Sequence, residues 1–196
     1  MIEKVWMDTY TAEVGQQTLR SYIPKQLLLV GSASYNDDGS TTEGTAEGGR
    51  QIVLYSVNDF NFELEQIQSY AHVMHHEFAH ILHQNVEYDA EFEKITPSYS
   101  SSWMQMNDET ARSKGFITAY AFSSADEDFA EMVSIMLTNS PEDWDNMIEN
   151  AGNAAAVEAL RKKEAIVVAY MKNNWGVNMK DFQKEVVAAI EAAVRN

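Results

Sequence analysis

The pattern of apolar and polar positions in the first part of the chain predicts two short strands. The run Gln26–Val30 is almost wholly apolar and ends at Gly31, which predicts a buried strand. Residues Arg50–Asn58 alternate between two faces and predict a second strand. The polar, glycine-rich stretch Asn36–Gly49 predicts a loop or a long hairpin between them. A small mixed sheet is therefore expected early in the chain.

Helical periodicity begins at about Phe62 and continues to Gln84, with apolar side chains that recur at the spacing of a helical turn. Asn58 and Asp59 precede this segment and are expected to cap the helix. Residues 93–118 predict loops and a short helix. Further helices are expected to begin at Ser123 or Ser124 and at Ser140-Pro141, and to span Ala154–Asn173 and Asn178–Arg195 with a break at Gly176.

The chain of 196 residues shows no internal repeat and no linker long enough to separate domains. With 45% hydrophobic residues it can bury one sizeable core. We therefore expect a single α+β domain over residues 1–196. The sheet and the long helix are expected in about residues 1–90, and a mainly helical subdomain in about residues 91–196.

Charge and composition narrow the classes of partner and ligand. The chain carries 30 acidic residues against 14 basic ones, a net charge of −16, and has no cluster of basic residues for phosphate contacts. Nucleic acid and anionic membrane surfaces are therefore poor candidate partners. No apolar run approaches the roughly 18 residues of a transmembrane helix, and the N-terminal residues lack a signal-peptide profile. Because cysteine is absent, a metal would need histidine, carboxylate or carbonyl ligands.

The strongest chemical pattern is His76-Glu77-Phe78-Ala79-His80 on the predicted long helix. His76 and His80 lie one turn apart, about 5–6 Å, so their imidazoles can converge on one ion. Glu77 lies about 100° further around the helix, where it can accept a proton from water activated by that ion. A chance match in a histidine-rich helix is the alternative. The context that the metal pattern requires is an apolar opposite face, and the helix offers Met74, Phe78, Ile81 and Leu82.

The other histidines of this helix are not expected to bind the same ion. Along a straight helix His76 and His83 are about 10 Å apart, too far to share one coordination shell. His72 and His83 are instead expected to support the ligands, to hydrogen-bond in the core or to be exposed. His75 points to another face and is expected to be a hydrogen-bonded structural histidine. The positions of the extended metzincin pattern hold His83 and Val86, so the chain is not a metzincin.

Catalytic zinc needs a third protein ligand, which is expected from the segment after Ser124. Glu127 and Glu131 lie one turn apart, opposite an apolar stripe, so one can bind the metal while the other supports a ligand histidine. We assign Glu127 as the ligand and Glu131 as the supporting acceptor. The same residues also describe an ordinary solvent face, and Ser124 with Glu127 has the spacing of a capping box.

Several further residues allow two interpretations. Tyr120 lies seven positions before Glu127 and could donate a hydrogen bond to the oxyanion of a tetrahedral intermediate. By spacing alone it is more typical of a core aromatic residue. Trp103 could line a specificity pocket, although a core position is the stronger expectation. The polar stretch Asn36–Gly49 could overhang a cleft or simply be solvated.

Together these residues resemble a known family. His76–His80 with Glu127–Glu131 resembles the Glu-zincin plan, and the position of the tyrosine is similar to that in the protease domain of anthrax lethal factor. From about Trp6 to Thr138 the chain also resembles bacterial zinc-binding metallopeptidase lipoproteins, import-associated zinc metallohydrolases encoded beside outer-membrane nutrient-import systems. The segments Leu28–Ser32 and Gly44–Arg50 share this likeness.

The resemblance implies a zincin-like fold in which His76, His80 and Glu127 bind zinc (Zn2+), with Glu77 as base and Tyr120 assisting. It implies a peptide or protein substrate and an extracytoplasmic location, with nutrient-import proteins as partners. It also implies a lipid-anchored full-length form, whose attachment cysteine is not in this sequence.

The expected function is therefore hydrolysis of peptide bonds by zinc-activated water. One alternative is a zinc-containing binding or accessory protein with little chemistry, and another is a hydrolase of other amides. In such folds the strand before the metal helix pairs with an extended substrate, which points to Arg50–Val57 as the binding edge. A plain hairpin strand is the alternative for that segment.

Overall fold

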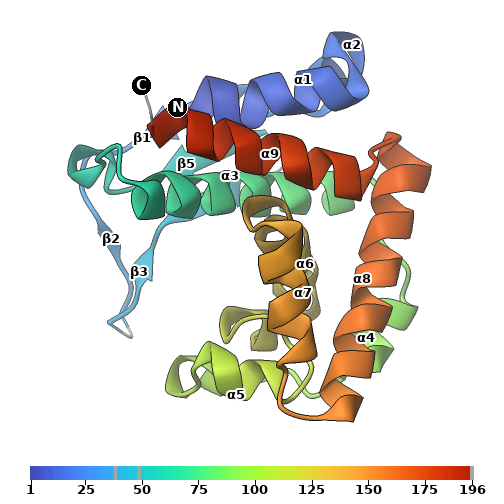
Figure 1. The fold of residues 1–196 in the computed structure, drawn as a ribbon. Helices are drawn as coiled ribbons and strands as arrows, with labels where there is room; N and C mark the ends of the chain where they lie inside the picture. The colour runs from blue at the N-terminus through green and yellow to red at the C-terminus, as the bar shows by residue number, and fades with distance from the viewer. Residues whose placement is uncertain (38, 48–49, 195–196) are drawn as a thin grey trace.

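The computed structural model describes residues 1–37, 39–47 and 50–194. Helices contain most of these residues and the sheet is small, so the fold is mixed α+β as predicted (Figure 1). Parts of the predicted loop at 36–49 and the predicted helix end at Arg195 lie outside the described residues.

The first 22 residues are helical, which the sequence pattern did not indicate. The π-helix η1 (Glu3–Met7), α1 (Asp8–Val14) and α2 (Gln16–Tyr22) precede the sheet. Gly15 separates the last two with a φ of 79°, a conformation in which glycine carries no steric penalty. The elements η1 and α1 follow each other without a break, and the wider π-helical turns of η1 shift its side chains from the regular α-helical period.

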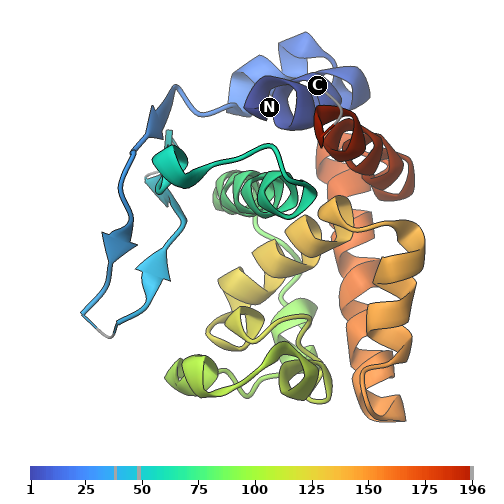
Figure 2. The same ribbon diagram turned by 60° about the vertical axis from the view of Figure 1, so that its left-hand side comes forward.

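The sheet has the strand order β1-β5-β4. Strand β1 (Gln26–Leu29) pairs in parallel with β5 (Gln51–Leu54), and β4 (Gly44–Glu47) pairs antiparallel with the other edge of β5. A separate hairpin of β2 (Ser34–Tyr35) and β3 (Thr41–Thr42) projects away from the body of the molecule (Figures 1 and 2).

Two expectations for the strands were wrong. The segment that contains β5 cannot be a free binding edge, because β5 pairs on both sides and its residues Ile52–Leu54 are buried. Strand β1 forms as predicted but is not buried, since Leu28 and Leu29 are 47% and 51% exposed. The long helix packs on β4 and β5, and β1 is an outer strand that keeps its leucines at the surface.

The long helix α3 (Leu64–Asn85) follows the predicted boundaries closely and buries its predicted apolar face. The expected cap was wrong. Asn58 and Asp59 belong to the 3-10 turn η2 (Val57–Asp59), several residues before the helix. The helix begins after Glu63, whose side chain makes no capping hydrogen bond.

The second half of the chain is helical, with short elements before long ones. Ser124 and Ser140 cap the two helices that were predicted to begin there, and Gly176 ends another helix with a φ of 75°. The elements are α4 (Glu91–Ile95), η3 (Ser101–Gln105), α5 (Asp108–Arg112), η4 (Tyr120–Phe122), α6 (Ala125–Thr138), α7 (Pro141–Glu149), α8 (Ala154–Trp175) and α9 (Met179–Val194).

The core lies where α3 meets α6 and α9. Helix α6 packs across α3, and α9 contacts both of them as well as α1 (Figures 1 and 2). Phe78 of α3 contacts the rings of Trp6 and Tyr10 from the N-terminal helices. This packing fixes α3 and α6 against each other and so determines which of their polar side chains meet. Among the described helices, none has the length and apolar character to cross a membrane.

Candidate metal centre

Three potential ligand atoms from α3 and α6 converge at one point. The Nε2 atoms of His76 and His80 lie 3.1 Å apart, and Oε2 of Glu127 lies 3.0 Å from the first and 3.2 Å from the second. In tetrahedral zinc with bonds of 2.0–2.1 Å, neighbouring ligand atoms are about 3.3 Å apart. The triangle therefore has close to the size that a zinc ion requires.

The contacts of Nδ1, the other ring nitrogen of each histidine, explain why the Nε2 atoms have a lone pair available to bind a cation. Nδ1 of His76 lies 2.8 Å from Oε1 of Glu131, an ion-pair contact that is bent relative to a straight hydrogen bond. Nδ1 of His80 lies 2.9 Å from Nε2 of His83. When Nδ1 donates to these acceptors, the lone pair of each ring is left on Nε2. Two lone pairs and a carboxylate oxygen then face one another, an arrangement that a cation stabilises.

The electrostatics of the three residues agree with a cation site. Burial opposes a charge on His76, yet hydrogen bonds to Glu127 and Glu131 raise its pKa to about 10. Burial acts against ionisation of Glu127 as well, but His76 and His80 lower the pKa of Glu127 to about 2. Without a metal the triangle therefore keeps a proton near neutral pH, and a bound metal ion must replace that proton.

Glu131 is the centre of a buried network behind the ligands. It is 3% exposed, accepts a hydrogen bond from Oγ1 of Thr118 at 2.6 Å, and lies 3.2 Å from Nε2 of His72. Burial alone would raise its pKa, but His72 and His76 hold the pKa of Glu131 well below its usual value. The alternative interpretation of Glu131 as part of a solvent face was therefore wrong. Thr118 also accepts from the backbone N–H of Ala121, which links the network to η4.

The group His72, His76 and Glu131 also has donor atoms close enough to hold an ion. It shares His76 with the first group, and a neutral imidazole has a lone pair on only one nitrogen. If Nε2 of His76 binds a metal, Nδ1 keeps its proton and can only donate to Glu131. The triangle is therefore the better candidate for holding an ion, and His72 and Glu131 are candidates for supporting it.

Glu77 and Tyr120 line the same cavity as His76 and Glu127. Glu77 is 7% exposed, and burial is the main cause that raises its pKa. Tyr120 is 37% exposed, and its ring centre lies 5.8 Å from that of His76 and 4.9 Å from that of Trp103. Neither aromatic residue is in the core, so that expectation was wrong for both. Burial and the Glu127 carboxylate raise the pKa of Tyr120, which keeps its phenol protonated.

These residues line one cavity of about 580 Å³, a size typical of ligand sites. Its walls come from α3, α6, η3 and η4, and the β2–β3 hairpin closes one side through Asn36, Thr41 and Thr42. The described part of the polar stretch at 36–49 thus overhangs the site. Among the described residues that line this cavity, none is a lysine or an arginine.

The local sequence of α6 explains how the Glu127 side chain reaches the two histidines. Ser124 caps the helix by accepting from the backbone N–H of Glu127 at 3.3 Å, as the capping-box spacing predicts. The Glu127 side chain does not return to the cap but turns toward the two histidines. The predicted cap is therefore confirmed, and the assignment of Glu127 as a metal ligand stays a prediction that this side-chain position allows.

His75 differs from its prediction. It is fully buried between Tyr10 and Phe182, and no described residue makes a well-oriented hydrogen bond to its ring nitrogens. Burial and the charge of His72 lower the pKa of His75 to about 3, while the backbone of Val5 opposes this shift. His75 is thus a neutral core residue.

The hydrogen bond from Thr118 to Glu131 could not be predicted from the sequence, because the position of Thr118 has no characteristic spacing from the other site residues.

Fold and site together define a mixed α+β protein with a candidate metal centre of two histidines and one carboxylate. Residues 1–180 match the family described as "Putative zinc-binding metallo-peptidase", and the chain belongs to that family. It is similar over its whole length to the crystal structure of a "putative zinc-binding metallo-peptidase" from Bacteroides caccae, with 33% identity and a TM-score of 0.84, covering 76% of that chain. No curated protein is similar enough to match.

Proposed function

We propose that the protein is a zinc metallopeptidase of the Glu-zincin type, with zinc held by His76, His80 and Glu127. The observation that carries this proposal is the triangle of two Nε2 atoms and one carboxylate oxygen, 3.0–3.2 Å apart, beside the buried carboxylate of Glu77. Zinc in such a site acidifies water and polarises the carbonyl of the scissile bond.

The residues around the triangle have suitable chemistry for the proton transfers. Glu77 accepts a proton from the attacking water and then donates it to the leaving nitrogen, and its raised pKa suits both steps. Tyr120 donates its O–H to the carbonyl oxygen as negative charge develops there. The contact with Trp103 holds the Tyr120 ring at the cavity wall.

An extended peptide would reach the site along β4 instead of β5. Strand β4 is the edge of the sheet next to α3, and its first residue, Gly44, lines the cavity. The free edge of a strand can hydrogen-bond to the backbone of an extended ligand. The proposed binding edge is thus β4 and not the predicted β5, whereas the proposed mode of binding, a substrate strand added to the sheet, is the one predicted.

The test of the proposed function compares the zinc-loaded wild type with Glu77→Gln on a diverse peptide library. We expect the wild type to cleave peptides, and Glu77→Gln to keep its zinc while it loses at least about 100-fold in kcat, the range of general-base catalysis. Equal cleavage by Glu77→Gln would contradict the role of the base. A wild type that binds zinc and cleaves no peptide would contradict the peptidase and favour a binding or accessory protein.

Zinc affinity tests the ligand set separately. Glu127→Ala removes one of three protein ligands and should reduce zinc affinity by more than the roughly 10–100-fold typical of an outer partner. Glu142→Ala, an exposed carboxylate on α7, is the matched control and should bind zinc as the wild type does. Unchanged affinity in Glu127→Ala would show that another residue is the third ligand.

The family resemblance also supports an extracytoplasmic setting for this activity, with a lipid anchor in the full-length form and nutrient-import proteins as neighbours. Cell fractionation of the epitope-tagged full-length protein tests this part of the proposal. Recovery in the outer-membrane fraction is the expected result, and recovery in the cytosol would contradict it.

A further inference from the structure

A second, smaller cavity opens beside the metal cleft. It has a volume of about 140 Å³ and shares Thr41, Thr42, Glu43 and Val73 with the larger cavity. The cleft therefore continues along α3, past the hairpin and toward the N-terminal end of that helix. A water molecule takes up roughly 30 Å³, so the cavity has room for the end of a side chain.

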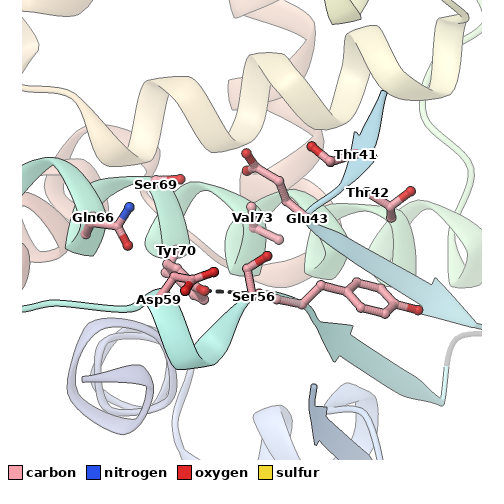
Figure 3. A pocket seen from close by; sticks show the side chains of 10 residues that line it. Thr41, Thr42, Glu43, Ser56, Asp59, Gln66, Ser69, Tyr70 and Val73 are labelled. Atoms are coloured by element: carbon pink, nitrogen blue, oxygen red, sulfur yellow. Dashed lines mark hydrogen bonds between the residues drawn. The ribbon is translucent and has the colours of Figure 1, made fainter. Parts of the chain in front are cut away.

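Three elements build this cavity, as Figure 3 shows. Helix α3 forms one wall, the segment after β3 brings Glu43 over it, and the turn η2 brings Asp59 from another side. The complete lining consists of Thr41, Thr42, Glu43, Tyr55, Ser56, Asp59, Gln66, Ser69, Tyr70 and Val73. Two carboxylates are thus the charged groups in a lining that is otherwise neutral and mainly polar.

The two carboxylates lack cationic partners within the described part of the chain. The ion pairs found there join other residues, and neither Glu43 nor Asp59 takes part in one. The two groups of side chains that could hold a metal do not include them either. No lysine or arginine among the described residues therefore neutralises their charge, and they belong to no described group of three or more side chains that could hold a metal ion.

The wall between the two carboxylates is fixed. The O–H of Tyr70 donates to the backbone oxygen of Tyr55 at 3.0 Å, which ties α3 to the end of β5. The N–H of Asp59 donates to the oxygen of Ser56 at 3.0 Å, which holds the turn that carries Asp59. Burial raises the pKa of Tyr70, and the charges of Asp59 and Glu43 raise it further, so both carboxylates act on one hydroxyl.

We propose that this cavity is a subsite for a cationic side chain of the substrate, in which Glu43 and Asp59 determine specificity. The inference rests on the proposed peptidase function, because it seats a lysine or arginine of the peptide at a fixed number of residues from the scissile bond. The ammonium or guanidinium group would donate to the two carboxylates. The neutral oxygens around them, such as those of Ser69 and Gln66, can accept the remaining hydrogen bonds.

The larger cavity reinforces this preference. Its lining includes Glu43, Glu77, Glu127 and Glu131, and the described residues place no lysine or arginine there. A bound zinc ion would offset two of these four negative charges, and the remainder still attracts a substrate that carries positive charge and repels an acidic one. Glu43 and Asp59 are both exposed to water, so a neutral peptide would leave them hydrated but without a charged partner.

The test uses peptide libraries in which one position at a time is lysine, arginine, norleucine, glutamine or glutamate. Binding is measured with zinc-loaded Glu77→Gln protein, which should not cleave, and cleavage with the zinc-loaded wild type. We expect lysine or arginine at a single position to be favoured over norleucine by about five- to tenfold in binding, decreasing at high salt. Glu43→Gln/Asp59→Asn, made in the same background, should abolish this preference.

A charge-matched variant serves as the control. Glu185→Gln/Glu191→Gln removes two exposed carboxylates on α9 that line neither cavity, and it should keep the full preference. If it loses the preference as the cavity variant does, the effect belongs to net charge and the subsite is wrong.

The outcomes separate the subsite from the proposed function. Equal binding of lysine and norleucine peptides overturns the subsite, whether or not cleavage occurs. A binding preference that depends on Glu43 and Asp59 supports the subsite even if the wild type cleaves no peptide. Absence of cleavage would overturn the proposed peptidase function but not the subsite. Cleavage with no preference for a basic residue supports the peptidase and overturns the subsite.

Discussion

Nε2 of His83 lies 2.9 Å from Nδ1 of His80, one turn further along α3. The His83 ring is buried and packs edge-on against Tyr88 and Phe129, which limits its rotation. Burial and the charge of His80 lower the pKa of His83, so the ring stays neutral and can accept a hydrogen bond. The spacing that keeps His83 from the metal thus places it behind a candidate ligand.

Loss of this partner should weaken zinc binding without removing a ligand. We expect His83→Phe to reduce zinc affinity by about 10–100-fold, the usual cost of losing an outer partner of a ligand histidine. Competition with a chromogenic chelator measures this effect. His83→Gln keeps an acceptor and should lose less, whereas an unchanged affinity in His83→Phe would mean that other contacts orient His80.

Gly44 should be needed for the position of Glu77. A Cβ atom at Gly44 would lie 2.5 Å from Cγ1 of Val73 and 3.3 Å from Oε1 of Glu77. Gly44→Ala must therefore move Val73 or β4, and Glu77 must also give way slightly. A displacement of about 1 Å at a catalytic group can cost about 100-fold in rate. We expect a smaller displacement of Glu77, so kcat for peptide cleavage should decrease by less than that factor while zinc content stays unchanged.

The matched variant for this prediction is Gly44→Ala/Val73→Ala. It removes the Cγ1 atom that the new methyl group would meet, and it should recover part of the lost rate. Gly44→Ala protein that is fully active would show that β4 can move away from α3 without disturbing Glu77.

Sequence spacing could predict which residues of each helix belong to the candidate site. It could not predict the different contacts that each of these residues makes. The turn between His76 and His80 is a property of any helix, and α3 forms nearly where its periodicity begins and ends. The same holds for Glu127 and Glu131 on α6. That Glu127 points to Nε2 of His76 while Glu131 lies behind Nδ1 depends on the packing of α6 across α3, which no local pattern encodes.

For strand β1 the sequence pattern predicted the strand correctly but predicted its burial wrongly. Gln26–Leu29 forms the strand that its short apolar run, ended by Gly31, predicts. An apolar strand is buried only if another layer covers it, and α3 packs on the other two strands of the sheet. The subsite at Glu43 and Asp59 was missed for a similar reason, since it joins three elements that are separated in sequence.

Lys163 and Asp128 form a buried ion pair in which each side chain depends on the other. Nζ of Lys163 donates to Oδ2 of Asp128 at 2.5 Å and to the backbone oxygen of Gly115 at 2.8 Å, and both side chains are fully buried. Tyr99 donates to the same carboxylate oxygen. Removal of one partner leaves an uncompensated buried charge, which typically costs about 3–5 kcal/mol.

We therefore expect Lys163→Met to lower the free energy of unfolding by about 3–5 kcal/mol in urea titrations followed by circular dichroism. Replacement of both partners, as in Lys163→Met/Asp128→Leu, removes the isolated charge and should cost less than Lys163→Met alone. Losses that simply add in the double variant would show that the two residues do not depend on each other.

The neutral core histidine His75 should make the metal-free protein less stable in acid. Its pKa is about 3 in the folded chain and about 6.5 when exposed, so the unfolded state binds one more proton between these values. The free energy of unfolding should therefore decrease as the pH falls below about 6.5, by up to roughly 1.4 kcal/mol per pH unit from this residue. The groups that face it are Tyr10, Phe182 and His72.

Urea unfolding of chelator-treated protein at a series of pH values between 7 and 4 measures this slope. His75→Phe removes the titrating ring and keeps an aromatic group of similar size, so the slope should decrease by about one proton, or roughly 1.4 kcal/mol per pH unit. Chelation is needed because zinc would add its own dependence on pH. Identical slopes in the two proteins would mean that His75 takes up its proton in the folded state, which would require the packing around Tyr10 to open.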